Sequence, residues 1–197
     1  MQTGIGKVET REVRESDFKK LVEMGNVQYG AGYLFDEDFL GAMTDPDRFC
    51  LVADVDGVVS GFVICREIGP EKEKDEINLP DCPERDRIRS KKKIGLLDSV
   101  CIAKGMEGRG LGTLLCGKCF ERFAEDGCDC SVSMAWVRSD GFEPIARLLR
   151  KADFERTSLV LPDYWQQWMT PDGECPFCEV GCHCKAALWF KDMPKMK

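Results

Sequence analysis

The sequence predicts one α/β domain, of the α+β kind, built on a mixed, mostly antiparallel sheet with helices on both faces. Short runs rich in β-branched residues alternate with segments in which apolar residues recur every three or four positions. Turn signals separate these runs, and no internal repeat is present. The length of 197 residues suits a single hydrophobic core. We therefore expect residues 1–197 to form one domain.

The first half of the chain predicts two helices and a β-hairpin. Phe18, Leu21 and Val22 have the spacing of one buried helix face. Asp56 and Gly57, between two β-rich runs, are a strong signal for a hairpin turn. The expected elements are a strand at 8–13, a helix that begins at 15–18, a helix at 36–43, and strands at 50–55 and 58–65.

The second half predicts a strand, a glycine-rich turn and a long helix, followed by shorter elements. Leu111, Leu115 and Phe123 lie on one stripe of that helix. Residues 69–93, before the strand, carry dense charge and almost no apolar side chains, which predicts an inserted, exposed loop. A cysteine-rich loop at 162–184 joins the last two strands. The expected elements are strands at 94–103, 130–137, 156–161 and 185–190, a helix from the glycine turn to about 125, and a helix at 144–152.

The formal net charge of −7 argues against nonspecific binding to nucleic acid and fits attraction of a cationic acceptor, such as an amine. No stretch approaches the roughly 18 to 20 apolar residues that a membrane span needs. Residues 1–7 lack the apolar core of a secretory signal. We therefore expect a cytoplasmic protein that binds neither nucleic acid nor membranes. Its oligomeric state stays open, with a dimer as one option.

The glycine-rich turn has the features of a phosphate site. Glycine lets the backbone turn tightly and approach a ligand, and the first amides of a helix have no intrahelical partner. With the helix dipole they favour an anion such as a diphosphate. Neither a P-loop nor the glycine spacing of a dinucleotide fold is present, and a turn that binds nothing is the alternative. The segment consists of Glu107, Gly108, Arg109, Gly110, Leu111, Gly112 and Thr113.

Residues 97–103 and the glycine segment resemble the central motif of the GNAT superfamily of N-acetyltransferases, in which a strand leads to Arg/Gln-x-x-Gly-x-Gly/Ala. The predicted order of elements is similar to the family over residues 8–191. The resemblance implies that amides of the segment hold the diphosphate of coenzyme A. It also implies that the backbone of Val100, Cys101 and Ile102 pairs with the pantetheine arm and the acyl carbonyl. Glu107 departs from the pattern, because the family has Arg or Gln there.

The activity implied by this resemblance is acyl-CoA-dependent N-acyl transfer. Acetyl-CoA is the expected co-substrate, and an amine-bearing small molecule or protein is the expected acceptor. One alternative is a non-catalytic sensor that binds acyl-CoA and responds to metal or redox state through its cysteine-rich loop. Another is an iron–sulfur protein in which the glycine turn is incidental.

Two residues are candidates for acid–base catalysis. Asp98 stands two residues before Val100, where many members of the family carry a catalytic carboxylate, and is the candidate general base. Its alternative role is a hydrogen bond to a neighbouring loop. Leu149 occupies the position of the family's usual tyrosine acid, which leaves Tyr164 as the candidate acid or as an aromatic residue that lines the acceptor site.

Four cysteines near the C-terminus have the spacing of a metal site. A Cys-Pro-x-Cys turn is similar to the knuckles of zinc and rubredoxin-like sites, and four thiolates suit tetrahedral Zn²⁺. Iron, an iron–sulfur cluster, a reversible disulfide and reduced thiols are the alternatives. We expect a bound ion to staple the aromatic residues of loop 162–184 into an acceptor pocket. The cysteines are Cys175, Cys178, Cys182 and Cys184, and His183 is a substitute ligand.

Overall fold

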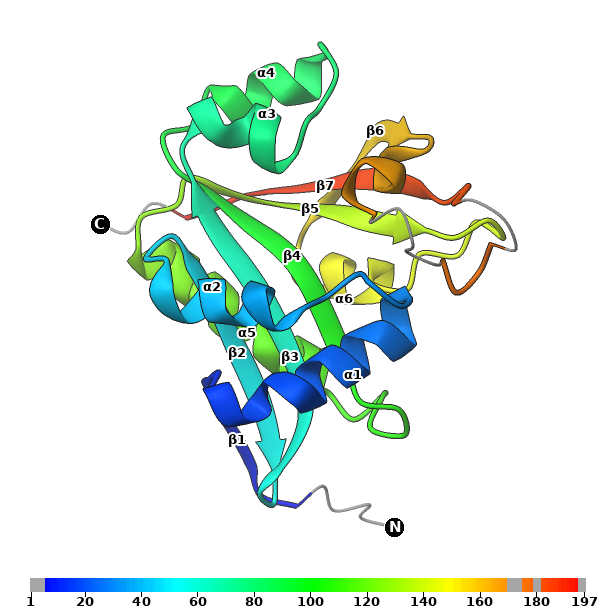
Figure 1. The fold of residues 1–197 in the computed structure, drawn as a ribbon. Helices are drawn as coiled ribbons and strands as arrows, with labels where there is room; N and C mark the ends of the chain where they lie inside the picture. Colours follow the sequence, from blue (N-terminus) through cyan, green and yellow to red (C-terminus); the bar gives the residue numbers. More distant parts are fainter. Residues whose placement is uncertain (1–5, 170–174, 179–181, 195–197) are drawn as a thin grey trace.

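The computed structural model describes residues 6–169, 175–178 and 182–194. Its strands form one sheet with the order β1-β2-β3-β4-β5-β7-β6 (Figure 1). Only β4 and β5 run parallel among the strand pairs of the described residues, so the predicted mixed, mostly antiparallel sheet is confirmed. The strands are β1 (Val8–Glu12), β2 (Arg48–Val55), β3 (Val58–Ile68), β4 (Ile94–Ile102), β5 (Cys130–Val137), β6 (Glu155–Leu161) and β7 (Lys185–Asp192).

Helices cover both faces of the sheet, as predicted (Figure 1). On one face α1 and α2 pack through Leu21 and Phe39 onto Phe62 of β3. On the other face α5 packs through Leu115 and Phe123 onto β2, β3 and β4. The α-helices are α1 (Phe18–Tyr29), α2 (Asp36–Thr44), α3 (Glu73–Glu76), α4 (Pro83–Arg89), α5 (Leu111–Glu125) and α6 (Ala146–Lys151). Short 3-10 helices are η1 (Glu15–Asp17), η2 (Pro70–Lys72) and η3 (Tyr164–Trp168).

The two central strands part from each other soon after they begin. β4 pairs with β5 only through Ile94, Gly95 and Leu96, and Figure 1 shows the strands diverging beyond that point. In the pairing of β3 with β4, the register shifts so that Asp98 has no counterpart on β3. The backbone of the second half of β4 therefore has β3 on one side and no strand on the other.

The segment 69–93 is not the exposed loop that its composition predicts. It forms η2, α3 and α4, and its few apolar residues are buried against the sheet: Ile77, Leu79 and Ile88. Glu73 is fully buried, where its carboxylate accepts hydrogen bonds from the Leu79 amide at 2.9 Å and from Arg85 Nε at 2.8 Å. The prediction was wrong because a few well-placed apolar side chains anchor a segment whose average composition is highly charged.

Replacement of Ile88 tests whether this segment belongs to the core. Ile88→Ala is expected to lower the free energy of unfolding by about 2–4 kcal/mol, because it leaves a cavity in a fully buried position. Arg89→Ala, at the exposed neighbouring position, is the control and is expected to change it by less than about 0.5 kcal/mol. Urea denaturation measures both variants. Equally small effects would contradict a structural role for the segment.

Candidate active site

The glycine-rich turn lies between β4 and α5 with residues 107–110 exposed. Gly108 and Gly110 have φ values of +73° and +87°, in the left-handed region that favours glycine. Gly110 is the N-cap of α5, so the amides of Leu111, Gly112 and Thr113 belong to the first turn of a 15-residue helix and lack intrahelical partners. This geometry suits an anionic group at the start of α5.

Glu107, the departure from the family motif, folds back onto its own turn. Its Oε2 accepts a hydrogen bond of 2.6 Å from the Gly105 amide. The carboxylate is therefore held by the turn itself, and its charge is partly satisfied before any phosphate binds.

On the edge of β4 that faces away from β3, side chains at the end of α1 form hydrogen bonds with the backbone. The Val100 amide donates to the Tyr29 hydroxyl at 3.1 Å, and the Val100 carbonyl accepts from that hydroxyl at 2.6 Å and from Gln28 Nε2 at 2.9 Å. Burial raises the pKa of Tyr29 well above its usual value, so the phenol remains a neutral donor. Sequence reasoning missed Tyr29, because only the packing of α1 across β4 brings it to this position.

Cys101 has a different environment from its neighbours on β4. Its side chain is buried, and its Sγ lies 3.5 Å from the Met24 carbonyl of α1. Burial, with a smaller effect from the negative charge of Glu107, raises the pKa of the Cys101 thiol to about 12. Cys101 is thus a packed, protonated thiol rather than a nucleophile.

Asp98 forms an ion pair with an arginine from β3. Its Oδ2 lies 2.9 Å from Arg66 Nη2, and Arg66 also bonds to Glu76 of α3. The Asp98 side chain is 27 % exposed, so it remains accessible from the cleft while the guanidinium fixes its orientation. A second arginine, Arg48 of β2, also pairs with Glu76, with 3.8 Å between Arg48 Nη2 and Glu76 Oε1. The segment 69–93 thereby takes part in positioning Asp98.

Tyr164 lies in a less open position than the sequence suggests. Its hydroxyl donates to the Ile77 carbonyl at 2.6 Å, and its side chain is buried. It lines a chamber of about 190 Å³ behind Asp98 and not the main cleft. Tyr33, which sequence reasoning missed, lines both cavities. Burial, followed by the charge of Asp98, raises the pKa of Tyr33, which keeps it protonated.

The parting of β4 and β5 opens a cleft of about 830 Å³. It brings together the start of α5, the open edge of β4, the Asp98 carboxylate and the cysteine-rich loop. Of the other residues of the glycine segment, Gly108, Arg109 and Gly110 lie in the turn, whereas Leu111 and Thr113 belong to α5. Cys101 packs with residues of α1. The predicted site residues that line the cleft are Asp98, Val100, Ile102, Glu107, Gly112, Cys175 and Cys182.

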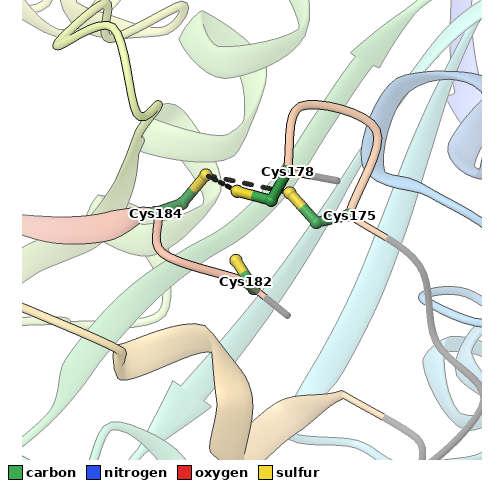
Figure 2. Close-up of side chains that lie close together, drawn as sticks. All are labelled: Cys175, Cys178, Cys182 and Cys184. Atoms are coloured by element: carbon green, nitrogen blue, oxygen red, sulfur yellow. Dashed lines mark hydrogen bonds between the residues drawn. The ribbon is translucent and has the colours of Figure 1, made fainter. Parts of the chain in front are cut away.

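The four cysteines of loop 162–184 point toward one another (Figure 2). Their Sγ atoms all lie within 4.8 Å, with Cys184 at 3.8 Å from Cys175 and 3.7 Å from Cys178. A tetrahedron with Zn–S bonds of about 2.3 Å has edges of about 3.8 Å, whereas a disulfide bond is about 2.05 Å long. The His183 imidazole is not part of the group. The thiols therefore fit one tetrahedral ion.

Comparisons with known proteins agree with this architecture. The sequence profile described as the acetyltransferase (GNAT) family matches residues 10–154. NAA60 of Arabidopsis thaliana in complex with a bisubstrate analogue has a TM-score of 0.68 at 13% identity, covering 96% of this chain and 100% of that one. The ribosomal-protein-S18-alanine N-acetyltransferase of Escherichia coli has a TM-score of 0.63 at 12% identity, covering 97% and 96%.

A third solved structure, yncA of Salmonella typhimurium with its cofactor acetyl-CoA, has a TM-score of 0.61 at 15% identity and covers 98% of this chain and 97% of that one. Among curated proteins no sequence gives a significant match. At these identities the solved structures show a common fold. In the part of the chain that the structure describes, none of the helices has the length and apolar character of a membrane span.

Alanine replacements at two glycines, one in the turn and one inside α5, are expected to change stability in opposite directions. Gly110→Ala is expected to cost about 1–2 kcal/mol of stability, because a Cβ at this left-handed position is strained. Gly117→Ala, in the interior of α5 where a Cβ meets open space, is expected to add about 0.5–1 kcal/mol. Urea denaturation compares the two variants, and effects of the same sign would contradict the assigned geometry.

Proposed function

Because the chain belongs to the GNAT acetyltransferase family, we propose that it transfers an acetyl group from acetyl-CoA to a primary amine of a small molecule or protein. One observation carries the proposal. The cleft between β4 and β5 has unpaired helix amides at one end and an oriented carboxylate beside it. Acyl transfer needs a site for the coenzyme, which the amides would provide, and a group that accepts the proton of the amine, which the carboxylate would provide.

The coenzyme would lie along the open edge of β4. The amides from Glu107 through Thr113 hold its diphosphate, and the backbone of Val100 and Ile102 pairs with the pantetheine arm. In the free protein the Tyr29 hydroxyl and the Gln28 amide satisfy Val100. The coenzyme would displace these contacts. The neutral phenol of Tyr29, released from the Val100 carbonyl, would then be suited to donate to an acyl carbonyl that gains negative charge.

The reaction proceeds by direct attack of the amine. Asp98 accepts a proton from the amine, directly or through water, and the nitrogen attacks the thioester carbonyl carbon. The C–N bond forms as the C–S bond breaks, and coenzyme A leaves as a thiolate that takes up one proton. Tyr33, a protonated phenol that lines the cleft, is the candidate donor. Tyr164 would instead shape the chamber behind Asp98, because its proton is already donated to Ile77.

Replacement of Asp98 tests the assigned base. Asp98→Asn is expected to lower kcat by about 100-fold or more while the Kd for acetyl-CoA stays unchanged, because the amide cannot accept the proton. Asp75→Asn is the matched control, since it makes the same change at an exposed position of α3 and is expected to keep its turnover. Release of coenzyme A with a panel of amines and peptides measures turnover.

Unchanged turnover in Asp98→Asn would remove Asp98 from the mechanism. Acetyl-CoA binding by the unaltered protein without release of coenzyme A for any acceptor in the panel would favour the non-catalytic sensor instead.

We also propose that Cys175, Cys178, Cys182 and Cys184 bind Zn²⁺. Support comes from sulfur separations of 3.7 and 3.8 Å, which match a tetrahedral thiolate site. The His183 amide, which donates to Cys178 Sγ at 3.4 Å, is suited to stabilise a thiolate ligand. Four thiolates close the coordination sphere, so the ion would have a structural role.

Metal analysis of cysteine variants tests this site. The unaltered protein, purified without oxygen, is expected to contain about one zinc per chain, and Cys178→Ser or Cys184→Ser is expected to lose it. Cys82→Ser, at a half-buried position far along the chain from the cluster, should retain the metal. Elemental analysis measures zinc and iron together. A brown protein that contains iron would change the assigned metal from zinc to iron. A protein without any metal would contradict the proposed site and indicate four free thiols.

A further inference from the structure

The cysteine cluster forms part of the wall of the cleft between β4 and β5. Cys175, Phe177 and Cys182 all line the cleft that also contains Asp98. The Cys175–Cys178 turn and the Cys182–Cys184 segment approach each other immediately before β7, as Figure 2 shows. A change in how these two segments are held together therefore changes the shape of the cleft itself.

Phe177 is the aromatic side chain by which the Cys175–Cys178 turn lines the cleft. It lies between two of the cysteines, with its ring centroid 5.1 Å from that of Trp136 in an edge arrangement. The guanidinium of Arg138 lies 3.9 Å from the Phe177 ring centroid on β5's side of the cleft. Phe177 is nevertheless 43 % exposed, so packing alone gives it only part of the stabilisation of a core phenylalanine.

Besides the ring contacts of Phe177, the Cys175–Cys178 turn is held by contacts through sulfur. Among the described residues, its hydrogen-bond contacts to other segments join Cys175 and Cys178 to Cys184, and Cys178 to the His183 amide. Neutral thiols at these separations attract one another weakly, whereas one ion bonded to all four sulfurs would fix the turn firmly. The position of Phe177 thus depends on what the sulfurs bind.

The second segment connects the cluster to the aromatic helix η3. Gln166 Nε2 donates to the Cys182 carbonyl at 3.0 Å, and Trp165 Nε1 donates to the Lys185 carbonyl at 2.9 Å. Trp165 lines both the cleft and the chamber behind Asp98. An ion in the cluster would hold Phe177 and Trp165 together as one aromatic wall next to Asp98.

The proposed binding elements for the coenzyme lie elsewhere in the chain. Among the described residues, the hydrogen bonds of the four sulfurs go to one another and to the His183 amide, and not to the start of α5 or to the open edge of β4. Loss of the ion would therefore change one side of the cleft and leave the other intact.

We propose that the metal bound by the four cysteines controls the binding of the acceptor amine, and not that of acetyl-CoA, by fixing Phe177 and Trp165 in the wall of the cleft. This inference rests on the proposed acetyl transfer for its choice of ligands. The coupling between metal and aromatic wall has a readout of its own, so it is testable in a protein without measurable turnover.

The test compares the metal-loaded protein with the same protein after chelation and after return of Zn²⁺. Hydrogen exchange measured by mass spectrometry is expected to rise by about tenfold or more in the peptide containing 164–168 when the metal is removed, and to recover with zinc. Acetyl-CoA binding by calorimetry should change by less than about twofold. For the amine or peptide that releases coenzyme A fastest, the KM should rise by about tenfold.

Two phenylalanine variants separate the aromatic wall from the metal. Phe177→Ala is expected to keep its zinc and its affinity for acetyl-CoA while raising the acceptor KM by about tenfold. Phe142→Ala is the matched control, because Phe142 is 55 % exposed, also lies near Arg138 and does not line the cleft. It should leave all three quantities unchanged.

The outcomes distinguish the two proposals. The coupling would be overturned if hydrogen exchange at 164–168 did not change when the metal is removed. It would also be overturned if metal removal lowered the affinity for acetyl-CoA as much as that for the acceptor. A protein that binds no metal would overturn it as well. Failure of every acceptor in the metal-loaded protein would overturn the proposed acetyl transfer, while a metal-dependent exchange at 164–168 would still support the coupling of metal and wall.

Discussion

The short parallel pairing of β4 with β5 is the constraint on which the rest of the site depends. Beyond Leu96 the strands part, and the backbone of β4 loses the partner that a continuous sheet would provide. Buried N–H and C=O groups need hydrogen bonds, and Tyr29 and Gln28 supply them at Val100. No strand covers this edge of β4, which lies next to the unpaired amides at the start of α5, and side chains of α1 bond to it in place of more sheet.

Among the twelve cysteines of the chain, two groups have different physical uses that depend on their surroundings. Cys50, Cys65 and Cys116 lie in the apolar core, where burial raises the pKa of each thiol and leaves a small hydrophobic side chain. The four cysteines before β7 instead face one another at separations suited to an ion. The sequence already separated the two groups. Ligands for one ion must lie close in space, and the four cysteines before β7 are close to one another along the chain.

The segment between β3 and β4 shows how composition alone misleads. Its charge density predicted a solvated loop, yet Ile77 and Ile88 are fully buried and Glu76 joins Arg66 beside Asp98. Tyr164 bonds to the Ile77 carbonyl, so this segment and η3 meet beside the chamber behind the carboxylate. A few apolar residues at separated positions become a core only when a sheet is present to receive them, and that sheet is built from distant parts of the chain.

The sequence by itself determined the order of the strands and of helices α1, α2, α5 and α6, but not α3 and α4. It also determined the glycine turn before α5 and the grouping of the four cysteines. These features depend on local periodicity, turn chemistry and spacing, and the predicted strands match β1 to β7 within three residues at each end. Only the tertiary structure decided that Tyr29 and Tyr33 reach the cleft, that Tyr164 turns toward Ile77, and that the cysteine cluster borders the space beside Asp98. The partners of a side chain depend on which distant elements pack against it, and no local pattern contains that information.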